Sequence, residues 1–320
     1  MTAPLRMGTR ASALARAQSS AAAAELTRAT GIPVEVVLVR TLGDQLSTEG
    51  KAPPGGDEAG VFTRALDEAL RRGEIDFAVH SLKDVPTVSS ADLLLAAVPP
   101  RADVRDALVV ARRLGASGVA TLQALPRDAR VATSSPRRVA QIRRLRPDLA
   151  AVAMAGNVDT RLARLEEGRA EALLLACAGL DRLSKDGVIS RRLPPEELLP
   201  APAQGALAMV CRADDVRSRE ALATQDDLSA HATAEAERSL LHHLRGGCRA
   251  PIGALATLEE GLLRLRGRVL SLDGSECLED EASGRAAGVA DAVAVGKALA
   301  EKLLARGATR LVDAARAAGL

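Results

Sequence analysis

The first 200 residues alternate short apolar runs with longer segments of helical spacing, and this alternation limits the possible folds more than any other feature. Strands separated by helices are typical of α/β domains with mostly parallel sheets. We expect strands at residues 5–9, 34–39, 75–79, 93–98, 107–110, 129–132, 150–154, 171–176 and 206–211, and helices at 13–30, 61–72, 135–146 and 158–167. The sequence therefore predicts an α/β fold.

Proline-rich segments divide the chain. The pair Pro99-Pro100 and the stretch 193–204 (LPPEELLPAPAQ) each interrupt the alternating pattern, which indicates two α/β domains. The last third differs: a helix is expected at 232–244, a hairpin at 262–279 around Asp273-Gly274, and a last helix at 290–304. This part is predicted to form a separate, smaller α+β domain.

Composition excludes several functions. Lys and Arg number 43 and Asp and Glu 41, a balance that argues against a nucleic-acid binder. Two Phe and no Tyr or Trp leave no platform for stacking bases. The four cysteines are far apart, so neither a metal site nor a disulfide framework is expected. Without a recognisable signal or a membrane-length apolar run, we expect a cytoplasmic protein that binds no metal, nucleic acid or membrane.

The first candidate site is the segment 78–86 (AVHSLKDVP), where four polar residues follow a buried strand. Ligands of open α/β sheets bind outside the carboxyl ends of strands. A carboxylate such as Asp84 can accept hydrogen bonds there and stabilise a developing positive charge. A solvated turn with a Lys–Asp pair explains the same residues about equally well.

Three further strand-to-helix junctions carry arginine: residues 9–12 (TRAS), 133–138 (TSSPRR) and 156–161 (GNVDTR). Free N–H groups at a helix start attract anions, and guanidinium groups strengthen that attraction. Each junction is equally consistent with an ordinary capped helix and an exposed arginine. The loop 246–253 (GGCRAPIG) offers Cys248 as an approachable thiol, although free cysteines are more often small buried apolar residues.

Taken in order, seven segments resemble the hydroxymethylbilane synthase (porphobilinogen deaminase) family. They are TRASALARAQ, AVHSLKDVP, TSSPRR, GNVDTR, AGLDRL, LPAPAQGA and GGCRAPIG, and with the hairpin and last helix they extend over most of the chain. The resemblance implies two periplasmic-binding-protein-like α/β domains with a cleft between them, plus a smaller C-terminal α+β domain. The implied boundaries are 1–102 with 203–221, then 103–202, then 222–320.

The resemblance also implies an activity, that of a transferase of porphyrin, tetrapyrrole and heme biosynthesis. Porphobilinogen would lose ammonia and be joined head to tail to a dipyrromethane cofactor, and water would release the linear tetrapyrrole hydroxymethylbilane. By their motifs, Cys248 would carry the cofactor through a thioether and Asp84 would be the catalytic carboxylate, which holds pyrrole N–H groups and stabilises the cationic azafulvene. A monomer is expected.

Arginine-rich surroundings would bind the acetate and propionate arms of each pyrrole. The residues that match the family's cofactor-binding positions are Phe62, Ser81, Lys83, Thr133, Ser134, Ser135, Arg137 and Arg138. Those that match its substrate-binding positions are Arg10, Ser12, Gln18, Arg161 and Arg182. Packing in the core explains Phe62 nearly as well.

Two positions depart from the family pattern. Ala155 stands where the family has an arginine, and Ala59 stands where it has a lysine, in the polar segment 41–60 that we expect to act as a lid. Each change removes a cation, and a charge-assisted hydrogen bond contributes roughly 1.5–3 kcal/mol. Two alternatives therefore stay open: a non-catalytic protein that binds a small anion, and a diverged paralogue defective in elongation.

Overall fold

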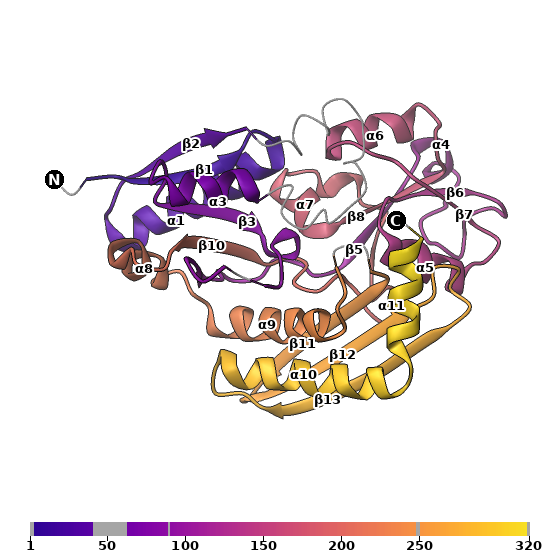
Figure 1. Ribbon diagram of the computed structural model, residues 1–320. Helices are drawn as coiled ribbons and strands as arrows, with labels where there is room; N and C mark the ends of the chain where they lie inside the picture. Colours follow the sequence, from indigo (N-terminus) through magenta and orange to yellow (C-terminus); the bar gives the residue numbers. More distant parts are fainter. Residues whose placement is uncertain (1–2, 41–62, 89, 248–249, 319–320) are drawn as a thin grey trace.

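The computed structural model describes residues 3–40, 63–88, 90–247 and 250–318, and these residues form three sheets (Figure 1). The first two sheets have five strands each, in the orders β2-β1-β3-β10-β4 and β7-β6-β8-β5-β9. The third has the order β11-β12-β13. The architecture is therefore α/β with an additional small α+β unit, as the sequence predicts. None of the described helices is long and apolar enough to cross a membrane.

The first sheet consists of β1 (Leu5–Arg10), β2 (Val34–Val39), β3 (Phe77–Ser81), β4 (Leu93–Ala97) and β10 (Leu207–Arg212). Its helices are α1 (Ala13–Thr30), α3 (Arg64–Arg71) and α8 (Val216–Ala223). Phe77 and Met7 are completely buried against α1, where half of the buried side chains of the helix are alanine. Small side chains bring α1 close to the sheet, so a core almost without aromatic residues still excludes water.

The second sheet consists of β5 (Asp106–Val110), β6 (Arg130–Ala132), β7 (Ala150–Val152), β8 (Ala172–Ala176) and β9 (Arg191–Leu193). Its helices are α4 (Arg112–Gly115), α5 (Pro136–Leu145), α6 (Val158–Glu166) and α7 (Cys177–Arg182). Ser135 caps α5 by accepting a hydrogen bond from the Arg138 N–H, and Pro136 occupies the first helical position. The expected strand-to-helix junction at 133–138 is present.

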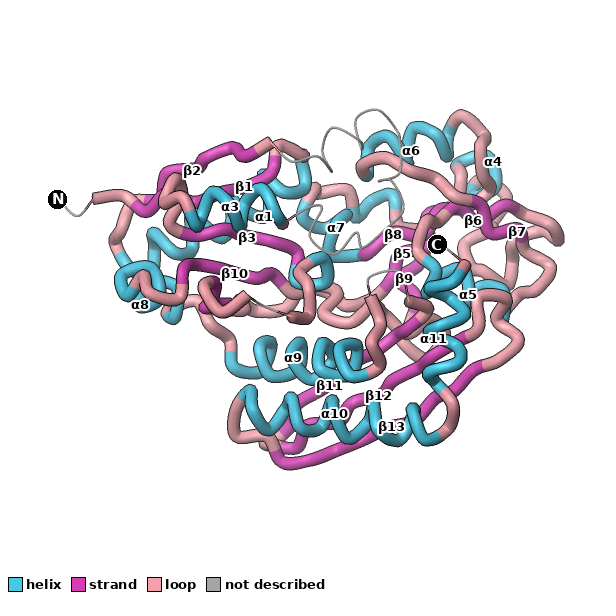
Figure 2. The backbone as a smooth tube through the Cα atoms, viewed as in Figure 1, coloured by secondary structure: helices cyan, strands magenta, loops and turns pink. Residues whose placement is uncertain are grey.

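Both large sheets are mixed: four of the five strands in each run in one direction, in line with the expectation of mostly parallel sheets, and the fifth strand, β10 or β5, runs against them. β10 pairs antiparallel with β3 and β4, and β5 pairs antiparallel with β8 and β9. The cause is the chain path in Figure 2: the chain leaves the first sheet after β4, forms the second sheet, and returns to place β10 between β3 and β4. The direction of a returning strand is set by this long connection, for which the sequence carries no local signal.

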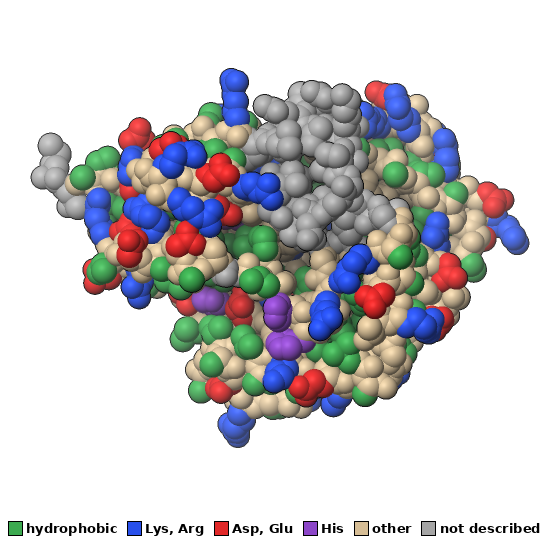
Figure 3. Space-filling view, viewed as in Figure 1, with side chains coloured by type: hydrophobic (Ala, Val, Ile, Leu, Met, Phe, Trp, Pro, Cys, Tyr) green, Lys and Arg blue, Asp and Glu red, His purple; other side chains and the backbone are tan. Residues whose placement is uncertain are grey.

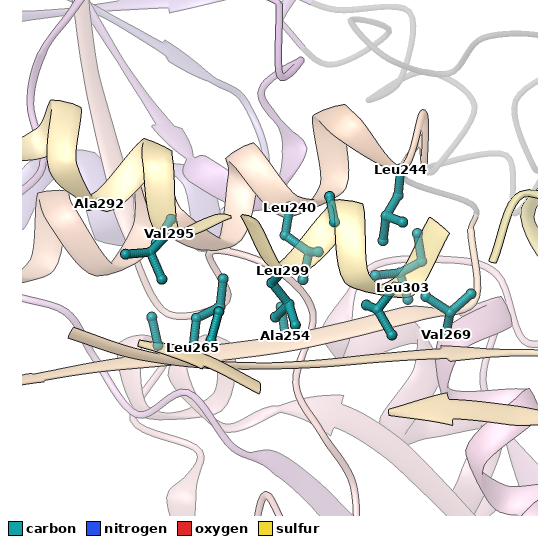
Figure 4. Close-up of a cluster of buried hydrophobic side chains, with 14 of the residues drawn as sticks. Leu240, Leu244, Ala254, Leu265, Val269, Ala292, Val295, Leu299 and Leu303 are labelled. Atoms are coloured by element: carbon teal, nitrogen blue, oxygen red, sulfur yellow. The ribbon is translucent and has the colours of Figure 1, made fainter. Parts of the chain in front are cut away.

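The third unit contains β11 (Ile252–Glu259), β12 (Leu262–Leu270) and β13 (Cys277–Arg285), with α9 (Leu228–His243), α10 (Val289–Ala305) and α11 (Ala308–Ala317). The predicted hairpin is β12–β13, whereas β11 and α11 were not expected. Figure 4 shows Leu240 and Leu299 from neighbouring helices pointing with Leu265 into one apolar cluster above the sheet. All three side chains are completely buried, so this unit has its own core.

One buried carboxylate joins this third unit to both connections between the large sheets. Glu237 on α9 is inaccessible to solvent and accepts two hydrogen bonds from the Arg101 guanidinium, each 2.8 Å long. It also accepts from the backbone N–H groups of Ala203 and Ala256. Arg101 follows β4 and Ala203 precedes β10, so a single side chain fixes both crossing segments. A buried charge with four hydrogen bonds is well compensated.

Gly205, in the second crossing segment, permits a very close approach of backbones. Its φ is +89°, and a Cβ atom added there would lie 2.5 Å from the carbonyl oxygen of Ala102. We expect Gly205→Ala to lower the free energy of unfolding by roughly 2–4 kcal/mol, since left-handed strain and a backbone clash both apply. Gly118→Ala is the matched control, because Gly118 has φ +81° but open space around it. Urea unfolding followed by circular dichroism should separate the two, and equal losses would contradict the role of the close approach.

Candidate active site

A cavity of about 500 Å³ lies between the two large sheets. It collects the segments that follow the carboxyl ends of β1, β3, β6, β7 and β8. Of the side chains expected to act on ligands, the following line it: Arg10, Ser12, Gln18, Ser81, Lys83, Asp84, Ser134, Ser135, Arg138, Arg161 and Arg182. The structure therefore brings together groups that are up to 172 positions apart in the sequence (182 − 10).

Four predicted residues do not contribute to this lining as described. Phe62 and Cys248 lie outside the described residues, as do Ala59 and the expected lid. Thr133 is buried behind the junction and accepts a hydrogen bond from the Ser135 N–H. Arg137 points away from the cavity: its guanidinium donates to Asp106 and to the carbonyl of Leu199. A contact between Arg137 and a ligand would require these bonds to rearrange.

Asp84 stands at the end of the short 3-10 helix Leu82–Asp84, directly after β3. Its half-buried carboxylate faces the cavity and makes no hydrogen bond within the described part of the chain. Arg238 on α9 holds the backbone after this turn, since it donates to the carbonyl groups of Val85 and Pro86. The Leu82 N–H donates to the carbonyl of Ala206 on the other side. The turn is thus fixed while the carboxylate stays available to a ligand.

The cavity holds more positive than negative groups. Arg10, Lys83, Arg138, Arg161 and Arg182 line it, opposed by only two acids, Asp84 and Asp159, among the described residues. By contrast, Figure 3 shows Lys and Arg side chains mixed with Asp and Glu over the outer face of the molecule. A concave, cation-rich site with low-dielectric walls attracts anionic ligands.

Burial lowers the pKa of three of these cations, Lys83, Arg161 and Arg182. It lowers the pKa of Lys83 to about 8, although the Asp84 carboxylate partly offsets it, and lowers the pKa of Arg161 to about 10, with further lowering by the charge of Arg138. Arg182 shows the same direction for the same reason. Anionic groups bound beside these side chains would restore their charged forms. The electrostatics therefore favour a ligand that carries several carboxylates.

A prediction follows for pH. Since the Lys83 ammonium loses its proton at a pH near 8, the free protein should bind a carboxylate ligand less tightly as the pH rises through that value. We expect kcat/KM to fall above pH 8, and the inflection to disappear in Lys83→Arg, whose side chain stays charged. The measurement is the pH profile of kcat/KM for both proteins, and an identical inflection in the variant would contradict this origin.

Two polar groups that sequence reasoning missed connect the two sides of the cavity. Gln204, almost completely buried, accepts a hydrogen bond from the Lys83 ammonium and donates to the carboxylate of Asp106. Asp106 in turn binds Arg137 and Arg138. Gln204 lies inside the LPAPAQGA motif, which could have indicated it. Asp106 begins an apolar strand and gives no local sign of its role.

His80 also lines the cavity, and its Nε2 atom is buried without a hydrogen-bond partner in the described structure. Burial, helped by the charge of Arg10, lowers the pKa of His80 to about 4, so the ring is neutral at neutral pH. Among the described residues, no three His, Cys, Asp or Glu side chains are arranged to hold a metal ion.

The residues present fit a dipyrromethane cofactor. Its acetate and propionate groups match the excess of cations, and the free Asp84 carboxylate is an acceptor for pyrrole N–H groups. Ser81, Ser134 and Gln18 add neutral donors along the wall. The fold and the site together define a protein with two α/β lobes that binds a polycarboxylate ligand between them, beside one available acidic group.

Comparison with known proteins identifies the family. The family model described as "Porphobilinogen deaminase, dipyromethane cofactor binding domain" matches residues 5–220, and "Porphobilinogen deaminase, C-terminal domain" matches 231–305. The porphobilinogen deaminase of Nocardia farcinica is 46% identical, with 97% of this chain and 88% of that protein covered. Porphobilinogen deaminase 1 of Streptomyces coelicolor is 45% identical, with 96% and 97% covered. The chain belongs to the porphobilinogen deaminase family.

Two solved structures are similar to this chain at low sequence identity. The periplasmic aliphatic sulphonate binding protein SsuA from Escherichia coli has a TM-score of 0.38 and 16% identity, with 77% of this chain and 76% of that chain covered. Peb3 from Campylobacter jejuni has a TM-score of 0.42 and 11% identity, with 74% and 98% covered.

Proposed function

We propose that this protein is a hydroxymethylbilane synthase, a transferase that joins porphobilinogen units head to tail and releases the linear tetrapyrrole hydroxymethylbilane. The observation that carries the proposal is the available Asp84 carboxylate in a cavity with an excess of cations. Family membership gives the substrate, porphobilinogen, and the cofactor, dipyrromethane. The cofactor supplies the free pyrrole carbon to which the first new unit is joined.

Asp84 is the catalytic carboxylate in this proposal. It accepts hydrogen bonds from pyrrole N–H groups and stabilises the positive charge that develops when the aminomethyl group of porphobilinogen leaves as ammonia. The fixed turn around Asp84 keeps this acceptor in place without reorganisation during the reaction. Lys83 beside it donates a hydrogen bond to Gln204, which orients the Lys83 ammonium.

The remaining side chains divide into two groups. Ser81, Lys83, Thr133, Ser134, Ser135, Arg137, Arg138 and Phe62 hold the cofactor, with Cys248 as its covalent attachment, and Arg10, Ser12, Gln18, Arg161 and Arg182 hold the substrate. The position of ten of these side chains around one cavity supports this assignment. For Thr133 and Arg137, the support is indirect: both order the start of α5, which carries Ser135 and Arg138.

We also propose three domains, 1–102 with 203–221, 103–202, and 222–320. The place of β10 beside β3 and β4 supports the assignment of 203–221 to the first domain.

The protein is further proposed to be a cytoplasmic monomer that binds neither nucleic acid nor membrane. The support is its nearly equal numbers of basic and acidic residues and its thiols. Cys177, Cys211 and Cys277 are free, which suits a reducing compartment.

Intact mass tests the central proposal. The purified protein should exceed the mass of its polypeptide by two linked pyrrole units, and Cys248→Ser should lose this excess because the thioether cannot form. Cys277→Ser is the matched control and should keep it. A protein of plain polypeptide mass that cannot be loaded with porphobilinogen would be the small-anion binder instead. Covalent intermediates without released product would indicate the paralogue defective in elongation.

A further inference from the structure

A second cavity, of about 260 Å³, lies away from the active site, between α5 and the C-terminal sheet. Three arginines line it, Arg144, Arg268 and Arg306, and the rest of its wall is Gln141, Leu145, Glu196, Cys277 and Glu279. Figure 1 shows α5 near one end of the C-terminal sheet, and α5 contacts β12. None of these residues belongs to the proposed catalytic or binding set.

Arg268 forms the floor of this cavity. Its side chain is only 10% exposed; Nε donates to Glu279 at 2.7 Å, and Nη1 donates to Gln141 at 2.7 Å. The Nη2 group makes no hydrogen bond within the described residues, and it is not among the atoms sealed from solvent. A guanidinium group held by protein acceptors on two sides can donate from the third to a ligand that enters the cavity.

Arg144 lies at the other wall, on the last turn of α5, and within the described chain it has neither a hydrogen-bond nor an ion-pair partner. Arg306 on the opposite side uses only Nη1, which donates to the Glu279 carbonyl and to Asp280. Burial raises the pKa of the Cys277 thiol, and the positive charges of Arg144, Arg268 and Arg306 each lower it. All three arginines therefore lie close enough to act on this one side chain.

The acids nearby offset part of this charge, since Glu279 pairs with Arg266 and Arg268, and Asp280 pairs with Arg306. Arg144 has no acidic partner among the described residues. Glu196 lines the rim as an exposed carboxylate with no partner among the described residues. We propose that the cavity binds a small oxyanion with at least two anionic oxygens, such as a phosphate or a dicarboxylate, between Arg144, Arg268 and Arg306.

An anion bound in this cavity would join α5 to the C-terminal sheet. Gln141 accepts hydrogen bonds from Arg268 and from the Leu199 N–H, so α5 is already joined to the C-terminal sheet at this point. The bound anion adds a second link at Arg144. The N-terminal end of the same helix, about 15 Å away, carries Ser135 and Arg138 into the active-site cavity. The anion site and the active site therefore share one rigid element.

Calorimetric titration of the cofactor-loaded protein with inorganic phosphate, and separately with succinate, tests the proposal at constant ionic strength. We expect Arg144→Gln to weaken binding of at least one of these anions about tenfold, through loss of a charge-assisted hydrogen bond. Glu196→Gln should strengthen the same binding because it removes a repelling charge. Arg143→Gln is the matched control: Arg143 has the same charge on the same helix, but donates to the Leu272 carbonyl and does not line the cavity.

The design separates this site from the active site. An anion in the active-site cavity competes with porphobilinogen, and that competition should be unchanged in Arg144→Gln. The proposal is overturned if neither anion binds, if both bind equally well to the parent protein and Arg144→Gln, or if Arg143→Gln weakens binding as much as Arg144→Gln. Because binding is measured directly, the result does not depend on whether the protein makes hydroxymethylbilane.

Discussion

Asp84→Asn should lower kcat by at least about 10²-fold while the protein stays folded. The substitution keeps the size of the side chain but removes the negative charge that stabilises the developing cation, and loss of one such electrostatic group typically costs 10²–10³-fold. Stability should change little, because the Asp84 carboxylate makes no hydrogen bond within the described part of the chain. Steady-state release of hydroxymethylbilane from porphobilinogen gives kcat, and thermal unfolding followed by circular dichroism gives the Tm.

The matched control is Asp214→Asn, since Asp214 is exposed and also has no side-chain partner among the described residues. It should leave both kcat and Tm unchanged. Asp84→Asn must also be shown to carry the cofactor by intact mass, because a protein that never acquires it would be inactive for another reason. A loaded Asp84→Asn protein with more than a tenth of the parent kcat would refute the assigned role.

Local sequence signals were enough to locate much of this site. Each motif at the end of β1, β3, β6 or β8 joins a strand to a helix, and the carboxyl ends of strands in an α/β lobe face one edge. Arg10, Asp84 and Ser135 could therefore be placed at such an edge without knowledge of the fold. Placing the edges of the two sheets on opposite sides of one cavity required knowledge of how the sheets are connected. That knowledge came from the resemblance to the family.

The sequence failed where the partners are far apart and the residue itself looks ordinary. Asp106 lies 31 positions from Arg137 and 98 from Gln204. Glu237 lies 136 positions from Arg101, inside a helix that otherwise reads as alanine-rich and amphipathic. Nothing in the spacing around these acids distinguishes a buried carboxylate from an exposed one. Their role follows from tertiary pairing, which has no periodic signature.

Tertiary pairing also explains why Arg137 points away from the cavity and not into it. The pair Arg137-Arg138 was expected to face a ligand, because adjacent arginines at a helix start form an anion site. In the structure, both guanidinium groups bind Asp106, and only Arg138 also lines the cavity. Asp106, a buried acid on β5, therefore gives Arg137 a structural role. The same carboxylate orients Arg138, which lines the cavity.

Asp106→Asn should therefore destabilise the protein by about 3–5 kcal/mol, the largest stability effect that we predict. Asp106 is inaccessible to solvent, and its carboxylate oxygens lie 2.7 Å from Nη1 of Arg137 and 2.6 Å from Nη2 of Arg138. Removal of one partner of a buried ion pair leaves uncompensated charge in a low-dielectric interior, here two guanidinium groups. Urea unfolding followed by circular dichroism is the measurement, since the chain has no Trp or Tyr to report by fluorescence.

The pH dependence gives an independent check on the same carboxylate. Burial raises the pKa of Asp106, but the charges and hydrogen bonds of Arg137 and Arg138 outweigh burial and hold that pKa well below its ordinary value. A folded-state pKa below the unfolded one contributes stability above about pH 4, and this stability is lost as the pH falls further. Asp106→Asn should thus be less stable than the parent at pH 7, with the difference in unfolding free energy narrowing between about pH 4 and pH 2.

Asp148→Asn, which breaks only a more exposed pair with Arg146, should lower the free energy of unfolding by no more than about 1 kcal/mol. If both variants lost equal stability, or if the Asp106→Asn difference did not change with pH, the buried pairing would not be what secures α5 beside the active site.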